Sequence, residues 1–286
     1  MKRSWAVVSF IIILIAACKK TDTTDSTVPL QTNYTNVAYG SDPAQVMDVY
    51  LPANRSTTYT NALIMIHGGG WIAGDKTDLA PWVDTMQRRF PTYAIFNLNY
   101  RLVSGSINIF PTQENDIRSA VAFIYSKRFD YFISTNYAIM GESEGAHLAL
   151  LEAYKDTIPI RIKSVIDFYG PADMRALFYD PAPLSDSNTI KKLFGEHSPS
   201  EDSLSYALSS PINFITPRVA PTFILHGGID QLVRHEQSDS LYAHLDSANV
   251  SRGYVLYGTQ GHGWTNNDTL TNSFNYIQSF IKATMP

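Results

Sequence analysis

The sequence predicts one α/β domain with a mainly parallel central sheet of about eight strands, helices on both faces and a short lid insertion. Three observations lead to this fold class. Short apolar runs recur along the chain, helical stretches separate them, and no internal repeat or second change of composition divides the chain. Apolar runs of about four to six residues are typical of parallel strands that are buried on both faces.

These runs and stretches set the expected elements. Strands are expected at 62–66, 93–98, 136–140, 164–168, 222–225 and 253–257. Helices are expected at 79–90, 115–128, 145–154, 236–248 and 270–283. Residues 39–50 are expected to form an antiparallel hairpin at the sheet edge. The long connection 171–218 is rich in proline and weakly periodic, which is typical of a lid or a binding element.

Composition excludes several classes of protein. Of the 286 residues, 44% are hydrophobic and 17% are charged, which is inconsistent with a disordered or fibrous chain. The formal net charge is -4 and no run of like charge occurs, so nucleic acid is not expected as a partner. With a single cysteine the chain forms no internal disulfide.

The N-terminal residues have the pattern of a secretory signal. Lys2 and Arg3 precede an apolar segment, 5–17, that is shorter than the ~20 residues a membrane-spanning helix needs. The sequence Ile-Ala-Ala-Cys at 15–18 resembles the lipobox of bacterial lipoproteins. This resemblance implies that residues 1–17 are a signal peptide and that Cys18 is lipidated and begins the mature chain.

The residues after Cys18 extend this interpretation. Residues 18–34 are expected to form the lipidated start and a flexible polar tether, and 35–286 the catalytic domain. We expect a lipid-anchored protein of the bacterial cell envelope that faces the periplasm or the exterior. Lysines rather than aspartate follow Cys18, which favours the outer membrane.

A Gly-x-Ser-x-Gly motif provides the first candidate for chemistry. Gly141-Glu142-Ser143-Glu144-Gly145 follows an expected strand and opens an expected helix. This strand-turn-helix context is what a nucleophile elbow requires, because the tight turn exposes the serine above the sheet and leaves no room for side chains two residues away. Ser143 is therefore the candidate nucleophile.

A glycine-rich loop follows the strand expected at 62–66. In His67-Gly68-Gly69-Gly70-Trp71, consecutive glycines allow backbone N–H groups to face a developing oxyanion. A phosphate-binding loop is rejected, because Asp75 stands where that motif needs lysine. His67 itself is expected to brace the loop.

Chain order selects the partners of the serine. In this fold the acid follows a later strand and the histidine follows the next one, which points to Asp230 and His262. His226 is expected to support the loop of the acid. The other histidines have no expected chemical role; they are His147, His197, His235 and His244.

At these residues, and from about Val37 to Phe280, the chain resembles the α/β-hydrolase superfamily. Within it, the chain is similar to bacterial esterases and lipases that carry His-Gly-Gly-Gly-Trp followed by Gly-Asp-Lys, here at 74–76. The resemblance implies that Ser143 is the nucleophile, that His262 is the general base and then the acid, and that Asp230 orients it. It also implies an oxyanion hole made by the backbone N–H groups of Gly69, Gly70 and Glu144.

The elbow departs from the pattern of this group. Its usual continuation is Ser-Ala-Gly-Gly, whereas this chain has Ser143-Glu144-Gly145-Ala146. A carboxylate beside Ser143 suggests discrimination against anionic substrates or a more basic His262. Glu142 is instead expected to hold neighbouring loops.

The expected function is that of a serine carboxylesterase that works through an acyl-enzyme and needs neither metal nor organic cofactor. Trp71, Tyr100, Tyr169 and Trp264 are the candidates for the substrate cleft, and they suit a sugar or aromatic ester. The resemblance includes acetyl, feruloyl and xylan esterases. A serine peptidase or amidase of the same superfamily and a catalytically silent binding protein are the alternatives.

Overall fold

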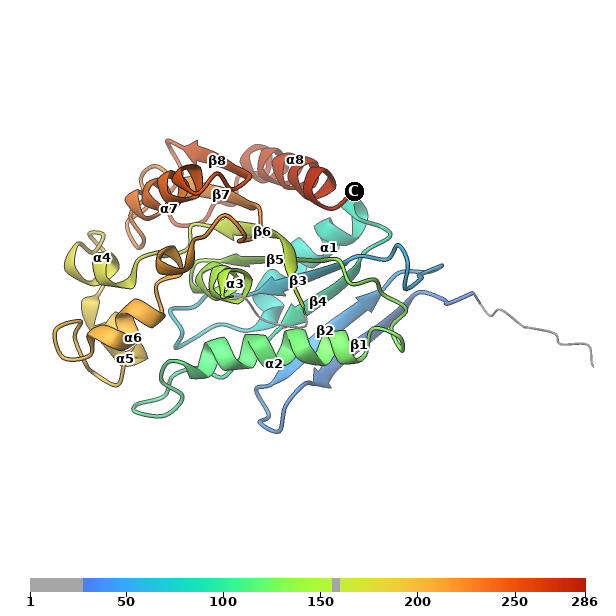
Figure 1. The fold of residues 1–286 in the computed structure, drawn as a ribbon, viewed down its shortest axis with the longest axis horizontal. Helices are drawn as coiled ribbons and strands as arrows, with labels where there is room; N and C mark the ends of the chain where they lie inside the picture. The colour runs from blue at the N-terminus through green and yellow to red at the C-terminus, as the bar shows by residue number, and fades with distance from the viewer. Residues whose placement is uncertain (1–27, 156–159) are drawn as a thin grey trace, which may run out of the picture.

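A computed structural model describes residues 28–155 and 160–286 (Figure 1). The predicted signal peptide and Cys18 lie outside the described residues. Within them, eight strands form one sheet in the order β1-β2-β4-β3-β5-β6-β7-β8. The strands are β1 (Thr32–Ala38), β2 (Val46–Leu51), β3 (Ala62–Ile66), β4 (Ala94–Leu98), β5 (Tyr137–Glu142), β6 (Ile162–Phe168), β7 (Thr222–Gly227) and β8 (Arg252–Tyr257).

The direction of the strands confirms the predicted fold class. β1 pairs antiparallel with β2 and β2 antiparallel with β4, and every pairing from β4 to β8 is parallel. The carboxyl ends of the parallel strands therefore meet at one edge, where sites form in α/β proteins. Each apolar segment predicted as a strand is found, with ends that move by at most two residues.

The N-terminal hairpin was placed wrongly by sequence. Its strands are β1 and β2, and residues 39–45 connect them, so the hairpin begins before residue 39. The predicted tether also extended too far, to residue 34, because Thr32 already pairs with Leu51. β1 is mostly exposed and polar, and it therefore lacks the apolar signal by which the buried strands are recognised.

Helices cover both faces of the sheet (Figure 1). Helices α2 (Thr112–Ser126), α3 (Glu144–Tyr154) and α7 (Glu236–Ser247) contribute buried side chains to one core cluster. Helices α1 (Ala80–Arg89) and α8 (Asn267–Thr284) contribute to the other. These five helices were predicted, with ends that shift by at most three residues.

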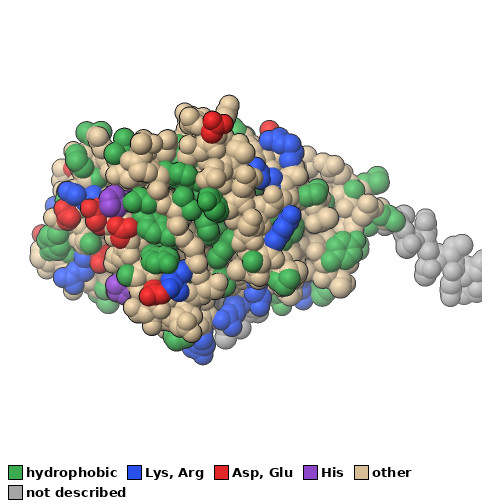
Figure 2. Space-filling model, turned by 90° about the horizontal axis from the view of Figure 1, so that it is seen from above, with side chains coloured by type: hydrophobic (Ala, Val, Ile, Leu, Met, Phe, Trp, Pro, Cys, Tyr) green, Lys and Arg blue, Asp and Glu red, His purple; other side chains and the backbone are tan. Residues whose placement is uncertain are grey.

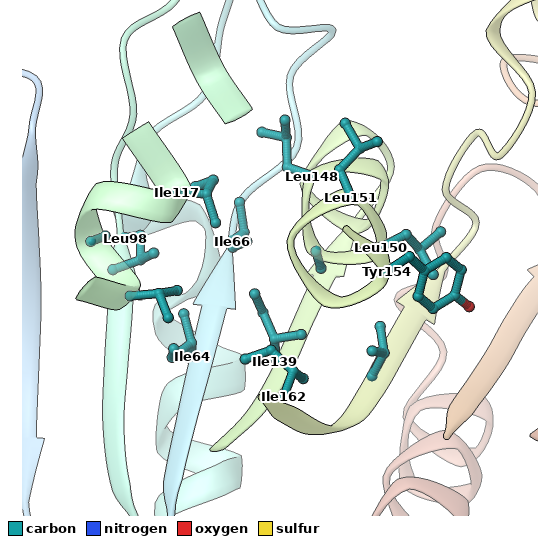
Figure 3. Close-up of a cluster of buried hydrophobic side chains, with 14 of the residues drawn as sticks. Ile64, Ile66, Leu98, Ile117, Ile139, Leu148, Leu150, Leu151, Tyr154 and Ile162 are labelled. Atoms are coloured by element: carbon teal, nitrogen blue, oxygen red, sulfur yellow. The ribbon is translucent and has the colours of Figure 1, made fainter. Parts of the chain in front are cut away.

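The strands supply the two cores by simple alternation. In β3, Ile64 and Ile66 belong to the cluster with α2 and α3, whereas Leu63 and Met65 belong to the cluster with α1 and α8. Successive side chains of a strand point to opposite faces, so a strand between two helical layers must be apolar throughout. Figure 3 shows Ile66 beside Ile117 of α2 and Leu148 of α3, with Ile64 next to Ile139 of β5.

The connection 171–218 contains helices that the sequence did not predict. They are α4 (Met174–Tyr179), α5 (Ser187–Leu193), α6 (Ser203–Leu208) and the 3-10 helix η2 (Pro211–Phe214). A further 3-10 helix, η1 (Lys76–Leu79), precedes α1. Each of α4, α5 and α6 begins at an aspartate whose side chain accepts backbone N–H bonds: Asp173, Asp186 and Asp202. Helices of two turns are too short to show a periodic apolar pattern.

None of the helices in 28–155 or 160–286 has both the length and the apolar character needed to cross a bilayer.

One strand carries a buried carboxyl group. Asp167 of β6 is fully buried; its Oδ1 accepts a bond of 2.8 Å from the Gly170 N–H, and its Oδ2 has no partner among the described residues. Burial raises the pKa of Asp167 to about 7, against the opposing effect of the Gly170 bond. The folded protein therefore retains a proton there that the unfolded chain releases near pH ~4.

This proton gives the first prediction. Because the folded-state pKa lies above the unfolded one, the contribution of Asp167 to stability falls as pH rises from about 4 to about 7. Asp167→Asn cannot lose such a proton, so its stability does not fall with pH in this way. Between pH about 4 and about 7 the variant therefore gains a few kcal/mol in the free energy of unfolding relative to wild type, because each pKa unit corresponds to about 1.4 kcal/mol. Urea unfolding across the pH range measures it. The exposed Asp84→Asn is the control, and parallel pH curves for wild type and Asp167→Asn would contradict the assignment.

Candidate active site

Ser143 lies in a sharp turn between β5 and α3. Its backbone has a φ of 51°, in the left-handed region that few non-glycine residues adopt. The Ser143 N–H donates to the Phe168 carbonyl at the end of β6, over 2.8 Å, which ties the turn to the neighbouring strand. This is the strand-turn-helix context that the sequence predicted.

The two glycines of the motif are required by close backbone approaches. A Cβ on Gly141 would lie 2.3 Å from the carbonyl oxygen of Gly145. A Cβ on Gly145 would lie 2.3 Å from the carbonyl oxygen of Ile66, at the end of β3. The second contact brings the helix after the nucleophile directly against the strand that leads into the glycine-rich loop.

Ser143, His262 and Asp230 come together at the carboxyl edge of the sheet. The Nε2 atom of His262 is 2.8 Å from Ser143 Oγ, and its Nδ1 atom is 2.7 Å from Asp230 Oδ2. Since Nδ1 faces a carboxylate, it carries the ring proton, and Nε2 is left to accept from the serine. These are the geometric relations of a nucleophile, a base and an orienting acid.

Asp230 is held by several donors at once. Its Oδ1 accepts from the backbone N–H groups of Leu232 and Val233, at 2.8 and 2.9 Å, and His226 Nε2 lies 3.2 Å from Oδ2. Burial acts to raise the pKa of Asp230, but the hydrogen bonds from His226 and His262 outweigh it and lower the pKa well below the ordinary value. Asp230 is therefore a carboxylate throughout the physiological range.

The glycine-rich loop lies beside the nucleophile. Gly69, Gly70 and Trp71 have φ values of 120°, 67° and 60°, and a Cβ on Gly69 would lie 2.0 Å from the Ala73 carbonyl oxygen. Gly69, Gly70 and Glu144 all line the same cleft as Ser143. Within the described residues, no acceptor bonds the N–H group of Gly69 or Gly70, so both remain available to a ligand.

Contacts with buried side chains hold the glycine-rich loop in place. The rings of His67 and Tyr100 stack at 4.5 Å, and the Tyr100 hydroxyl donates to the His67 carbonyl over 3.2 Å. Burial lowers the pKa of His67, which keeps this ring neutral. Further along, Lys76 forms an ion pair of 3.1 Å with Asp48 of β2. The sequence-based role of His67 as a brace agrees with these contacts.

A cleft of about 700 Å³ opens above Ser143. The connection 171–218 forms part of its wall, and no Lys or Arg of the described chain lines it. Figure 2 shows hydrophobic side chains gathered, with acidic and histidine side chains among them, at the end of the molecule that carries α4 and α7. The apolar lining consists of Trp71, Trp82, Tyr169, Pro171, Leu177, Leu184, Ile190, Leu232, Val233 and Trp264.

Of the four predicted cleft residues, Trp71, Tyr169 and Trp264 line the cleft, and Tyr100 does not. Tyr100 was wrongly placed because its ring is buried behind the loop, against His67. The sequence also missed Trp82 of α1, which packs on Phe168 with ring centroids 4.5 Å apart. Trp82 stands in no motif, and only the packing of α1 on the sheet brings it to the cleft.

Both glutamates of the elbow line the cleft, and their partners differ. Glu142 accepts a bond of 2.8 Å from the Tyr169 hydroxyl, and the Tyr169 ring lies 4.6 Å from that of His262. Glu144 is 4% exposed, and its Oε1 has no partner among the described residues. Burial raises the pKa of Glu144, opposed by the nearby Ser143 hydroxyl, which shifts it towards the neutral acid.

His147 connects three parts of the site. It accepts a long bond of 3.4 Å from Trp71 Nε1, and its Nε2 is 2.6 Å from the carbonyl oxygen of Ser209. Burial lowers the pKa of His147 to about 4, so the ring stays neutral. The helix after the nucleophile is thus joined to the glycine-rich loop and to the connection 171–218.

No cluster of three or more His, Cys, Asp or Glu side chains suited to a metal ion occurs in 28–155 or 160–286.

Comparison with known proteins assigns the family. The BD-FAE family model matches residues 47–245, which include Ser143 and Asp230. The chain belongs to the BD-FAE family. His262 lies beyond the matched range, and it is the fold that brings it to the other two residues.

Individual relatives are more distant. The chain is 24% identical to Esterase LipC of Mycobacterium tuberculosis, over 80% of this chain and 59% of the relative. It is also 24% identical to Dipeptidyl peptidase family member 6 of Caenorhabditis elegans, over 77% of this chain and 30% of the relative. The chain thus spans between about a third and three fifths of the length of these curated relatives.

A solved structure matches over nearly its full length. The truncated form of a carbohydrate esterase from gut microbiota superposes with a TM-score of 0.73 at 26% identity, covering 89% of this chain and 98% of that one.

The close approach of Gly145 gives a prediction on stability. Gly145→Ala places a methyl group 2.3 Å from the Ile66 carbonyl oxygen, so the elbow or the end of β3 must move. We expect a loss of about 3 kcal/mol or more in the free energy of unfolding, as for other overpacked core sites. Gly258→Ala, whose Cβ would meet nothing within 4 Å, is the matched control and changes stability by less than about 1 kcal/mol. Equal losses in the two variants would contradict the steric argument.

Proposed function

We propose that this protein hydrolyses carboxylic esters through an acyl-enzyme formed on Ser143. The observation that carries the proposal is the 2.8 Å contact between Ser143 Oγ and His262 Nε2, beside the N–H groups of Gly69 and Gly70, which have no acceptor among the described residues. A serine hydroxyl needs such a base to react at neutral pH. Membership of the BD-FAE family and similarity to an esterase and a carbohydrate esterase support the same activity.

The reaction follows from the positions of the groups. Ser143 Oγ attacks the ester carbonyl carbon while His262 Nε2 takes the serine proton, and the N–H groups of Gly69, Gly70 and Glu144 bind the oxyanion. Collapse of the tetrahedral intermediate breaks the bond to the alcohol oxygen, which receives the proton from His262. Water then attacks the acyl-enzyme while His262 takes its proton; collapse of the second tetrahedral intermediate breaks the bond to Ser143 Oγ, which receives that proton from His262, and the acid is released.

Asp230 acts through His262 rather than on the substrate. Its bond to Nδ1 holds the ring in the tautomer that presents Nε2 to Ser143, and its negative charge stabilises the imidazolium that forms. The lowered pKa of Asp230 keeps this charge in place.

For the substrate we favour an acyl group carried by a carbohydrate. The aromatic side chains of Trp71, Trp82, Tyr169 and Trp264 offer flat apolar surfaces of the kind on which sugar and aromatic rings pack. The superposition on a carbohydrate esterase supports this class. Amide hydrolysis is the second candidate, and the relation to a dipeptidyl peptidase supports it.

Ser143→Ala tests the activity. On p-nitrophenyl acetate and butyrate we expect kcat/KM to fall at least ~1,000-fold, because the nucleophile is lost while the fold is kept. The surface variant Ser119→Ala is the control and should match wild type. Hydrolysis of p-nitrophenyl esters by wild type but faster cleavage of aminoacyl p-nitroanilides would favour the amidase. No turnover in wild type, or equal turnover in Ser143→Ala, would reject the proposal and leave a binding protein.

Glu144 gives a prediction on charge and pH. When Glu144 ionises it adds a negative charge beside Ser143 in a cleft without Lys or Arg, so an anionic ester is disfavoured. We expect Glu144→Gln to raise kcat/KM several-fold for mono-p-nitrophenyl succinate relative to p-nitrophenyl butyrate. Because the pKa of Glu144 is raised, the gain grows with pH and is smallest in acid, where wild type is also neutral. A substrate ratio that does not change with pH or substitution would count against this role.

We further propose that the mature protein is lipid-anchored through Cys18 in the cell envelope. The signal-like residues 1–17 and the small residues before Cys18 support this location. In bacterial cells, Cys18→Ser should abolish incorporation of labelled palmitate and move the protein from the outer-membrane fraction to the soluble fraction. Unchanged labelling in Cys18→Ser would reject the anchor.

A further inference from the structure

A second histidine, besides His262, contacts the candidate acid. His226 is the penultimate residue of β7, is fully buried and does not line the cleft. Its Nε2 atom is 3.2 Å from Asp230 Oδ2 and 2.9 Å from the Val233 carbonyl oxygen. Its Nδ1 atom is 2.7 Å from the hydroxyl of Ser238, which is buried in the first turn of α7.

These contacts define the tautomer of His226. Both neighbours of Nε2 are acceptors, so Nε2 must carry a proton. Nδ1 faces the Ser238 hydroxyl over 2.7 Å, so both nitrogen atoms of the ring have a hydrogen-bond partner. His226 is thus a fixed donor to Asp230, oriented by Ser238.

The oxygen that His226 approaches is the one that binds His262. Asp230 Oδ2 lies 2.7 Å from His262 Nδ1 and 3.2 Å from His226 Nε2, while Oδ1 is occupied by two backbone N–H groups. With donors on both oxygens, the carboxylate has one orientation. Removal of His226 leaves Oδ2 with His262 alone and opens space for the carboxylate to turn.

We propose that His226 is a positioning residue of the active site, and that Ser238, His226, Asp230, His262 and Ser143 form one continuous hydrogen-bonded chain. The inference rests on the proposed function, since it assigns to His226 the placement of the acid that orients the base. His226 contacts neither the cleft nor the reacting atoms, and it acts through Asp230. A misplacement of the base by ~1 Å costs up to ~100-fold in rate.

The electrostatics of Asp230 point the same way. Burial opposes ionisation of Asp230, and the bond from His226 is the first of the effects that overcome it and lower its pKa. Without the bond from His226, burial acts on an Asp230 that has one donor fewer, so its charged form is less favoured. The imidazolium that the reaction needs then loses part of the negative charge that stabilises it.

The position of Ser238 links this chain to the wall of the cleft. The neighbouring Gln237 accepts from the N–H groups of Ala172 and Asp173, at 3.0 and 2.8 Å, where the connection 171–218 begins. The first turn of α7 therefore holds both the start of that connection and, through Ser238, the ring of His226.

The test uses His226→Leu, His226→Gln and Ser238→Ala in the full chain, assayed on p-nitrophenyl butyrate. We expect His226→Leu to lower kcat ~10- to 100-fold with KM changed less than ~3-fold, because the base is misplaced but the cleft is intact. His226→Gln keeps an N–H donor and should recover most of this loss. Ser238→Ala should lower kcat several-fold.

Ser164→Ala removes a buried hydroxyl that has no partner in the described residues, and as the control it should keep the wild-type kcat.

A second readout separates positioning from mere stability. The proton between His262 Nδ1 and Asp230 gives a downfield proton NMR resonance, which should move or broaden in His226→Leu and Ser238→Ala and stay in Ser164→Ala. Variants that lose thermal stability but keep both kcat and this resonance would overturn the proposal.

The role of His226 can be tested even if His226→Leu does not fold or wild type hydrolyses no ester. If His226→Leu does not fold, wild-type kcat and an unshifted resonance in Ser238→Ala overturn the inference. If wild type hydrolyses no ester, the proposed function fails, while the resonance still tests the contact of His226 with Asp230.

Discussion

The whole site depends on the contact between the helix after the nucleophile and the end of β3. Gly145 approaches the Ile66 carbonyl so closely that a Cβ there would lie 2.3 Å away. Ser143, two residues earlier, has a left-handed backbone conformation and lies in the same cleft as the loop that continues from β3. The nucleophile and the free N–H groups of Gly69 and Gly70 are therefore brought together by one steric constraint. The two parts of the site belong to neighbouring strands, and neither is positioned without the other.

Hydrogen bonding then determines which buried groups carry charge. Asp230 has donors on both oxygens and stays ionised, whereas Glu144 and Asp167 each have one buried oxygen without a partner among the described residues, and burial raises their pKa values. All three are buried carboxyl groups, so burial alone does not distinguish them. The number of donors does, because each N–H aimed at a carboxylate favours its charged form.

Ser143, Asp230 and His262 could be predicted from the sequence because the topology of a parallel sheet determines where such residues lie. In a parallel sheet the loops after successive strands meet at one edge, so chain order alone directs attention to Asp230 and His262 among many acids and seven histidines. No such rule predicts which residues form the wall of the cleft. Tyr100 was misplaced and Trp82 was missed because position along the chain does not say whether an aromatic ring faces the cleft or the core. The short helices of 171–218 were not predicted because two helical turns are too short to show a periodic apolar pattern.

By itself, the sequence determined the fold class, the order of the buried strands, the elbow, the glycine-rich loop and the identity of the three candidate triad residues. These features are local patterns: apolar runs, glycine spacing and order along the chain. Only the tertiary structure decided that His226 shares an oxygen with His262, that Glu144 lacks a partner, and that Trp82 lines the cleft. Such facts depend on the distance between atoms far apart in the chain, and a distance of a few tenths of an ångström determines whether a hydrogen bond forms.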